Sequence, residues 1–333
     1  MKADLMQELR RKARASPKRV VFPESGDEKI VRAARRVLDM GIAHPILVGN
    51  RSALYSLAEG IGIDISEIET IDNSEESRLD AFVQEYASIN PDFPARTARR
   101  ILTKPLYFAA MMVRTDYADA MVAGLDHTTG EVIMASQMII GMQEGIEVPS
   151  SMFLMSIPGY DGPEGNLIVF ADGSVCPDPS ADQLADIAIT TAETVHSLLD
   201  WEPRVAMLSF STKGSAPHPK VDHVLNALEL VKKRKPDLCI DGEFQVDAAI
   251  VPEVAAKKVP DGSLVAGRAN ILIFPDLNAG NIAYKLVQRL ARADAYGPLI
   301  QGFAKTVSDL SRGSTVDDIV GATIMVVVRA QAL

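Results

Sequence analysis

The chain has 333 residues, which is long enough for two domains with sizeable cores. Hydrophobic residues make up 47% of it and charged residues 23%, as is ordinary for a globular protein. The formal net charge of −10 argues against general nucleic-acid binding, because nucleic-acid phosphates require clustered lysine and arginine.

Extended apolar segments alternate with helical ones along the chain. The expected strands span residues 19–23, 44–48, 117–123, 151–157, 166–171, 204–210, 247–251, 269–274 and 298–303. Between several of them, apolar residues recur at helical spacing, and Ser180 with Gln183 forms an expected capping box. This alternation predicts a mostly parallel sheet with helices on its faces.

The last helix is expected from about Asp317 to Gln331, with Ser314 or Thr315 as its cap. Its apolar stripe consists of Ile319, Ala322, Thr323, Val326, Val327 and Ala330. Ser311, Arg312 and Asp318 place a hydroxyl, a guanidinium and a carboxylate around the start of this helix. A helix start is positively polarised, so the sequence predicts an anion site there.

Two upstream loops follow strand-like runs in the same way. Ser211, Thr212 and Lys213 come after the apolar run from Val205 to Leu208. A second loop, after residues 269–273, carries Asn278, Asn281 and Lys285. Open parallel sheets bind ligands at such strand ends, so these residues are candidate substrate contacts. For Lys213 and Lys285, a solvated surface position is an equal alternative.

Five separated motifs carry a family resemblance. They read SFSTKGSA, IDGEFQVDAAIVPEVA, FPDLNAGNIAYK, ADAYGP and DLSRGSTVDDIVG. In this order they resemble the phosphate acetyltransferases of the acetyl/butyryl family, and the similarity extends from Val20 to the C-terminus. The resemblance implies reversible acyl transfer between coenzyme A and inorganic phosphate.

The resemblance also implies an architecture. It is an α/β fold of two three-layer α/β/α domains with mostly parallel sheets and a cleft between them, like that of isocitrate and isopropylmalate dehydrogenases. Residues 1–147 plus 301–333 are expected to form the first domain and residues 148–300 the second. A homodimer is expected.

Catalytic roles follow from matching positions in the last motif. Asp318 is expected to accept the proton of the coenzyme A thiol, with Asp317 as the neighbouring rival that otherwise caps the helix. Ser311 would hold the thiol. Arg312 would offset negative charge on the phosphate and on the oxyanion.

A further loop and a turn would complete the phosphate site. The family's Ser-Gly-Ala-x-His-[Ser/Thr]-[Ser/Thr] loop resembles residues 122–131, whose Thr128 and Thr129 hydroxyls are suitable phosphate donors. His127 either orients this loop or acts as a general base. Tyr296 and Gly297 would line the opposite wall, or simply form a turn.

The chain departs from the family pattern at two arginines. Met134 stands where the family has the arginine of an Arg-Pro-Ala stretch, and the neighbourhood of Tyr86 lacks the second arginine. Those arginines are associated with coenzyme A or substrate anions. Arg96, Arg99, Arg100 or Arg114 are candidate replacements.

Three functions therefore stay open. The first is a phosphate acetyltransferase. The second is the same reaction on a larger acyl group such as butyryl, because Met134 makes one wall less polar. The third is a catalytically weak module that binds acyl-coenzyme A or acyl phosphate.

Other classes have little support in the sequence. A nicotinamide dehydrogenase is not indicated, because Glu24-Ser25-Gly26-Asp27 follows the first strand in place of a Gly-x-Gly-x-x-Gly motif. No metal or cofactor is expected beyond coenzyme A as a substrate, and Asp241, Glu243 and Asp247 come closest to a metal group.

Cys176 and Cys239 lie in no Cys-x-x-Cys group and are expected to be buried or incidental thiols. Without a signal peptide or an apolar run of roughly eighteen residues, a cytoplasmic protein with no membrane partner is expected.

Overall fold

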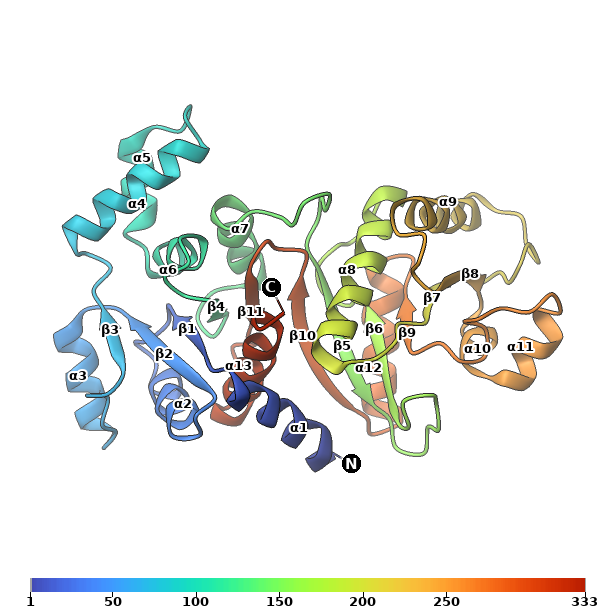
Figure 1. Cartoon of the computed structure of the whole chain (residues 1–333), viewed down its shortest axis with the longest axis horizontal. Helices are drawn as coiled ribbons and strands as arrows, with labels where there is room; N and C mark the ends of the chain where they lie inside the picture. The colour runs from blue at the N-terminus through green and yellow to red at the C-terminus, as the bar shows by residue number, and fades with distance from the viewer. Residues whose placement is uncertain (1, 333) are drawn as a thin grey trace. The chain divides into compact units, whose positions relative to one another are not determined.

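The structure is a computed structural model that describes residues 2–332. Its internal contacts divide the chain into two compact units (Figure 1). Residues up to 143 and from 303 onward form the first unit, and residues 144–302 form the second. The first unit is therefore discontinuous in sequence.

The sheet of the first unit is parallel and has the strand order β11-β4-β1-β2-β3. Its strands are β1 (Lys18–Phe22), β2 (Ala43–Val48), β3 (Glu69–Ile71), β4 (Ala120–Ala123) and β11 (Thr306–Asp309). Every residue of β4 and β11 is buried, as expected for strands covered on both faces.

Helices cover both faces of this sheet and make the unit three-layered. The helices of the unit are α1 (Lys2–Ala15), α2 (Glu28–Asp39), α3 (Arg51–Gly60), α4 (Glu76–Ile89), α5 (Ala95–Leu102), α6 (Pro105–Arg114), α7 (Thr129–Ile139) and α13 (Val316–Ala330). α13 packs on β1, β4 and β11 and against α2, while α6 packs on β1 and β4 from the other face and against α7 (Figure 1).

The second unit has a mixed sheet of strand order β10-β5-β6-β9-β7-β8. Its strands are β5 (Ser150–Ser156), β6 (Leu167–Ala171), β7 (Val205–Leu208), β8 (Ile240–Phe244), β9 (Ile271–Ile273) and β10 (Asp294–Gln301). β6, β9, β7 and β8 are parallel, whereas β5 is antiparallel to both of its neighbours.

The helices of the second unit are α8 (Ala181–Leu199), α9 (Pro219–Arg234), α10 (Val246–Ile250), α11 (Pro252–Lys258) and α12 (Leu277–Leu290). α8 and α9 pack against each other on the near face of the sheet, and α12 lies behind it (Figure 1).

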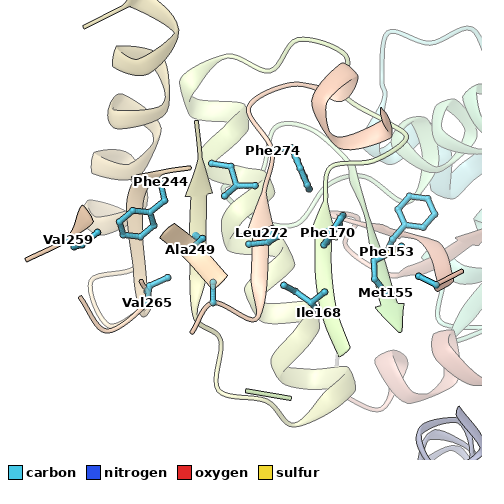
Figure 2. Close-up of a cluster of buried hydrophobic side chains, with 14 residues drawn as sticks. Phe153, Met155, Ile168, Phe170, Phe244, Ala249, Val259, Val265, Leu272 and Phe274 are labelled. Atoms are coloured by element: carbon cyan, nitrogen blue, oxygen red, sulfur yellow. The ribbon is translucent and has the colours of Figure 1, made fainter. Parts of the chain in front are cut away.

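A cluster of buried side chains fills the space on one face of this sheet (Figure 2). Phe153 and Met155 on β5, like Ile168 and Phe170 on β6, lie two residues apart and therefore point to the same face. Tyr284 of α12 stacks on Phe153 with ring centroids 4.1 Å apart. This stacking fixes α12 to the sheet.

Most expected elements are confirmed. The final helix runs from Val316 to Ala330, and its expected apolar stripe is buried. Ser180 and Gln183 form the expected capping box.

One expected strand is wrong. Residues 247–251 lie almost wholly in helix α10, because alanine favours a helix and Pro252 starts the next one. The short strand β3 and the polar strands β8 and β11 were not expected. Pairing of the expected strand 298–303 begins earlier, at Asp294.

Candidate active site

Two helices of the first unit begin beside each other at the carboxyl edge of its sheet. β4 and β11 run parallel, with Ala123 opposite Asp309, and the Leu310 amide donates to the Ala123 carbonyl at 2.7 Å. The chain then continues from β4 into α7 and from β11 into α13. Two positively polarised helix starts therefore lie at adjacent strand ends.

Gly124 allows the two strand-end loops to approach each other. Its φ of +108° is in the region that favours glycine. A Cβ at this position would lie 2.2 Å from Asp309 Oδ1 and 2.6 Å from the Leu310 nitrogen. No other residue fits there without moving the turn that follows β11.

A buried glutamate organises the loop after β4. The side chain of Glu24, which follows β1, is only 1% exposed. Its carboxylate accepts hydrogen bonds from four successive backbone amides, those of Gly124, Leu125, Asp126 and His127, at 2.7–3.1 Å. The loop is therefore held around one fixed anion.

The same carboxylate orients the ring of His127. Glu24 Oε1 lies 2.8 Å from His127 Nδ1. An ionised carboxylate can only accept, so we assign the proton on Nδ1 as its donor. Nε2 has no partner among residues 2–332, and the ring is partly exposed. His127 is thus oriented by a carboxylate, as in catalytic dyads, with its second nitrogen available.

Asp309, at the end of β11, is a second buried carboxyl group. Its Oδ2 accepts a hydrogen bond from the Thr129 hydroxyl, while Oδ1 has no partner among the described residues. Burial raises the pKa of Asp309 to about 6, and the charge of Glu24 adds to the rise.

The turn after β11 exposes Ser311 and Arg312. The Gly313 amide donates to the Ser311 hydroxyl at 3.3 Å, and the Ser311 amide donates to Ser314 Oγ at 3.1 Å.

The charge of Arg312 influences Asp126 in the loop after β4. Burial raises the pKa of Asp126, and the charge of Arg312 partly opposes this rise. Arg312 therefore acts electrostatically on the loop that carries His127.

Asp318 forms a capping box at the start of α13. Its Oδ2 accepts from the amide and the hydroxyl of Thr315, both at 2.8 Å, so Thr315 and not Ser314 is the cap. Asp318 Oδ1 has no partner among the described residues. Asp317, the expected alternative cap, instead pairs with Arg36 of α2.

The hydroxyls of Thr128 and Thr129 are both engaged within the unit. Thr128 Oγ1 contacts Glu131 in the capping box of α7, and Thr129 Oγ1 donates to Asp309. The groups that remain for an anion at this loop are therefore the amides of the first turn of α7, which begins at Thr129.

The polar side chains of the SFSTKGSA loop turn inward within the second unit. The Ser211 hydroxyl donates to the buried Glu243 at 2.7 Å, and Thr212 Oγ1 accepts from the Gln245 amide at 2.9 Å. Lys213 is exposed, and its Nζ lies 2.6 Å from Asp241 Oδ1, so it is a surface lysine whose ammonium is paired within the unit.

The other candidates of the second unit are dispersed. Asn281 donates to the Gly173 carbonyl at 2.9 Å, whereas Asn278 is exposed at the start of α12. Lys285 is exposed with its ammonium 5.5 Å from the centroid of the Tyr284 ring. Tyr296 and Gly297 lie on β10, where the pairing register with β5 shifts.

Two of the four candidate replacement arginines are occupied. Arg99 pairs with Asp80, and Arg114 donates to the Ile139 carbonyl at 3.1 Å. Arg96 and Arg100 are exposed on α5 without a partner among residues 2–332. Met134 is exposed on α7.

Metal-ligand groups and thiols are the remaining candidate features. Among the described residues, no group of three or more His, Cys, Asp or Glu side chains is arranged to hold a metal ion. Burial raises the pKa of Cys176 to about 11 and also raises that of Cys239, so neither is a thiolate at neutral pH.

None of the helices in residues 2–332 has the length and apolar character needed to cross a membrane.

Sequence reasoning gave no role to Glu24 or Asp309. Glu24 lies two residues after β1 and Asp309 is the last residue of β11. A carboxylate at the end of a buried parallel strand is the available signal for both. Their partners lie about 100 to 180 residues away in the chain, so the contacts themselves had no local signature.

These features define an α/β protein with a candidate anion site at the carboxyl edge of a parallel sheet. The family described as "Phosphate acetyl/butaryl transferase" matches residues 4–327. The chain belongs to this family of acyltransferases.

Two relatives illustrate the similarity. The phosphate acetyltransferase of Clostridium acetobutylicum is 44% identical over 330 residues, which cover 98% of this chain and 99% of the relative. A solved phosphotransacetylase from Streptococcus pyogenes is 40% identical with a TM-score of 0.93, covering 99% of both chains. The expected phosphate acetyltransferase function is confirmed by this similarity.

The expected dehydrogenase-like fold class is also confirmed. A 4-hydroxythreonine-4-phosphate dehydrogenase from Burkholderia phymatum has a TM-score of 0.51 at 11% identity, covering 94% of this chain and 97% of that chain. This likeness concerns the fold alone.

Proposed function

We propose that the protein transfers an acetyl group reversibly between coenzyme A and inorganic phosphate, by direct attack of the thiolate in a ternary complex. The observation that carries this proposal is the pairing of β4 with β11. It brings two helix starts, the oriented ring of His127 and the exposed guanidinium of Arg312 to one edge of the first unit. Such a combination suits an acyl phosphate.

Asp318 is assigned as the general base. One of its carboxylate oxygens caps α13, and the other is available to accept the proton of the coenzyme A thiol. Ser311 holds the thiol. The thiolate then attacks the acyl carbonyl, forming a carbon–sulfur bond.

Arg312 stabilises the oxyanion that forms at the acyl carbonyl. When the oxyanion collapses, the carbon–oxygen bond to phosphate breaks and phosphate leaves with the electron pair. His127 Nε2 is assigned to accept a hydrogen bond from a protonated oxygen of the phosphate, and the first amides of α7 are assigned to donate hydrogen bonds to its other oxygens. No covalent acyl-enzyme is needed, and no cofactor beyond coenzyme A takes part.

The reaction is tested by measuring thioester formation from coenzyme A with acetyl, propionyl and butyryl phosphate in turn. We expect turnover with acetyl phosphate and the highest kcat/KM for it. Fastest turnover with butyryl phosphate would favour the longer-acyl alternative, which the exposed Met134 on α7 supports. Binding of coenzyme A without turnover on any donor would instead favour the weak binding module.

Assembly and location are part of the same proposal. We expect a cytoplasmic homodimer, as in the resembled family. Exposed Ile282, Leu286 and Leu290 lie four residues apart on α12 and offer an apolar face for such a contact. Sedimentation at micromolar concentration tests it, and a monomer would contradict it.

A further inference from the structure

The proposed reaction involves a proton on phosphate as well as the one on the thiol, which Asp318 is assigned to accept. At neutral pH inorganic phosphate carries a proton, whereas the phosphoryl group of acetyl phosphate carries none. Phosphate that attacks acetyl-coenzyme A must therefore lose a proton, and phosphate that leaves acetyl phosphate must gain one. A positioned side chain that exchanges this proton would accelerate both directions.

The ring of His127 has the geometry that such a group needs. Glu24 Oε1 lies 2.8 Å from Nδ1 and holds the proton there, so the lone pair of the neutral ring is on Nε2. Nε2 has no partner among residues 2–332, and the side chain is 31% exposed. The ring can therefore take a proton from a bound group and release it to solvent.

Glu24 is also placed to support a charged ring. It follows β1, and His127 follows the neighbouring parallel strand β4 (Figure 1). Hydrogen bonds from four backbone amides hold the carboxylate in place, and its side chain is only 1% exposed. A fixed carboxylate against Nδ1 offsets the positive charge that the ring gains when Nε2 takes a proton.

Other side chains at this edge of the first unit fit the role less well. Asp309 is only 5% exposed, and one of its oxygens already accepts from the Thr129 hydroxyl. Arg312 is exposed but cannot give up its proton. Asp126 is exposed next to His127, yet its negative charge repels phosphate. A neutral imidazole can approach the anion without this repulsion.

We propose that Nε2 of His127 exchanges the proton of phosphate during acyl transfer. This step rests on the proposed function, which brings phosphate to the loop after β4. In the synthesis of acetyl phosphate, a phosphate oxygen attacks the thioester carbonyl and forms a carbon–oxygen bond, while the phosphate proton passes to Nε2. His127 is then a catalytic residue of the phosphate side, as Asp318 is of the thiol side.

The remaining steps complete the proton balance. The oxyanion collapses, the carbon–sulfur bond breaks, and the thiolate leaves with the electron pair and takes a proton from Asp318. The imidazolium of His127 then loses its proton to solvent, and Asp318 regains one. In the opposite direction every step is reversed, so the imidazolium protonates the leaving phosphate.

The first test uses a variant that keeps the contact with Glu24. The side-chain amide of His127→Asn can still donate to Glu24, but it has no group at the place of Nε2. We expect kcat to fall about 10²- to 10⁴-fold in both directions, with an unchanged KM for coenzyme A and an unchanged urea midpoint. His44→Ala, which removes an exposed histidine from β2 of the same unit, is the control and should keep its activity.

The second test asks whether an added base replaces the ring. His127→Gly leaves a partly exposed space that imidazole and methylated imidazoles of graded basicity can enter. These bases should restore acetyl phosphate synthesis, and the restored rate should rise with their basicity, because proton transfer follows base strength. His44→Gly should not respond to them. A ring that only holds the loop in place would give no dependence on basicity.

The outcomes separate this step from the proposed reaction. An unchanged kcat in His127→Asn would overturn the proton step and leave the reaction standing. Restoration by imidazoles that is absent, or independent of their basicity, would also overturn it. If the unmodified protein forms no acetyl phosphate from acetyl-coenzyme A and phosphate, the reaction itself fails and the proton step fails with it.

Discussion

Glu24 Oε1 lies 2.8 Å from Nδ1 of His127, although 103 residues separate them in the sequence. The glutamate also accepts hydrogen bonds from the amides of the loop that carries this histidine. Loop conformation and ring orientation therefore depend on one buried carboxylate. A change at Glu24 should affect both stability and the handling of phosphate.

Glu24→Gln should lower the free energy of unfolding by about 2–5 kcal/mol, because a neutral amide leaves buried donors unsatisfied. It should also raise the KM for phosphate, since the ring of His127 loses its partner. Urea denaturation and phosphate-dependent kinetics measure the two effects. Glu28→Gln, on the exposed surface of α2, is the control. An unchanged urea midpoint in Glu24→Gln would contradict this account.

Asp309→Asn should stabilise the protein at neutral pH. Burial raises the pKa of Asp309 from 3.8 to about 6, so its ionisation above that pH opposes folding. This rise in the pKa lowers the free energy of unfolding by about 3 kcal/mol at a pH where the carboxyl is ionised in both states. The advantage of the variant should be full above pH 6 and should decrease as the pH falls toward 3.8, below which the carboxyl is mostly protonated in both states.

Urea denaturation between pH 4 and 8 tests the behaviour of Asp309. The exposed Asp261→Asn should show no such pH dependence relative to the unmodified protein. A stability difference for Asp309→Asn that stays constant over this range would show that the carboxyl does not titrate there.

The cap and the base can be separated at the start of α13. Asp318→Asn retains an oxygen for the Thr315 donors but removes the base, so kcat should fall about 10²- to 10⁴-fold with little change in stability. Thr315→Ala removes the cap, costing about 0.5–2 kcal/mol of stability, and leaves the carboxylate in place. Similar activity loss in both variants would mean that Asp318 acts only through the helix start.

Gly124→Ala should be strongly destabilising. The added methyl would meet Asp309 and the backbone of Leu310, and a positive φ costs about 1–3 kcal/mol for a non-glycine residue. Gly130→Ala is the matched control, because its methyl group would meet no atom within 4 Å apart from its chain neighbours and the backbone of its own helix, and alanine favours the helix. Thermal unfolding compares the two, and equal melting temperatures would refute the steric argument.

The fold was predictable where hydrophobic periodicity and capping residues agree. The last helix and the Ser180 cap are examples, because both depend on residues within a few positions. β8 and β11 escaped prediction because polar residues interrupt both strands, namely Asp241 and Glu243 in β8 and Thr306, Ser308 and Asp309 in β11. Residues 247–251 resemble a strand only in hydrophobicity.

The site was predictable in its types of residue more than in their contacts. Arg312 is exposed and pairs with no residue in the described part of the chain, so its guanidinium is available for the expected role, which stays a prediction. Ser211, Thr212 and Lys213 instead bind Glu243, Gln245 and Asp241 of the same unit. Such tertiary pairing leaves no mark on a single sequence. The orienting role of Glu24 was hidden for the same reason.

The rate of acetyl-coenzyme A formation from acetyl phosphate and coenzyme A tests the central claim most directly. It should be measured for the unmodified protein, for Arg312→Gln and for the exposed control Arg289→Gln. We expect ready turnover that falls about 10²- to 10³-fold in Arg312→Gln and is unchanged in the control. Turnover that is absent in the unmodified protein, or equal in all three, would contradict the assignment of acyl transfer to the turn after β11.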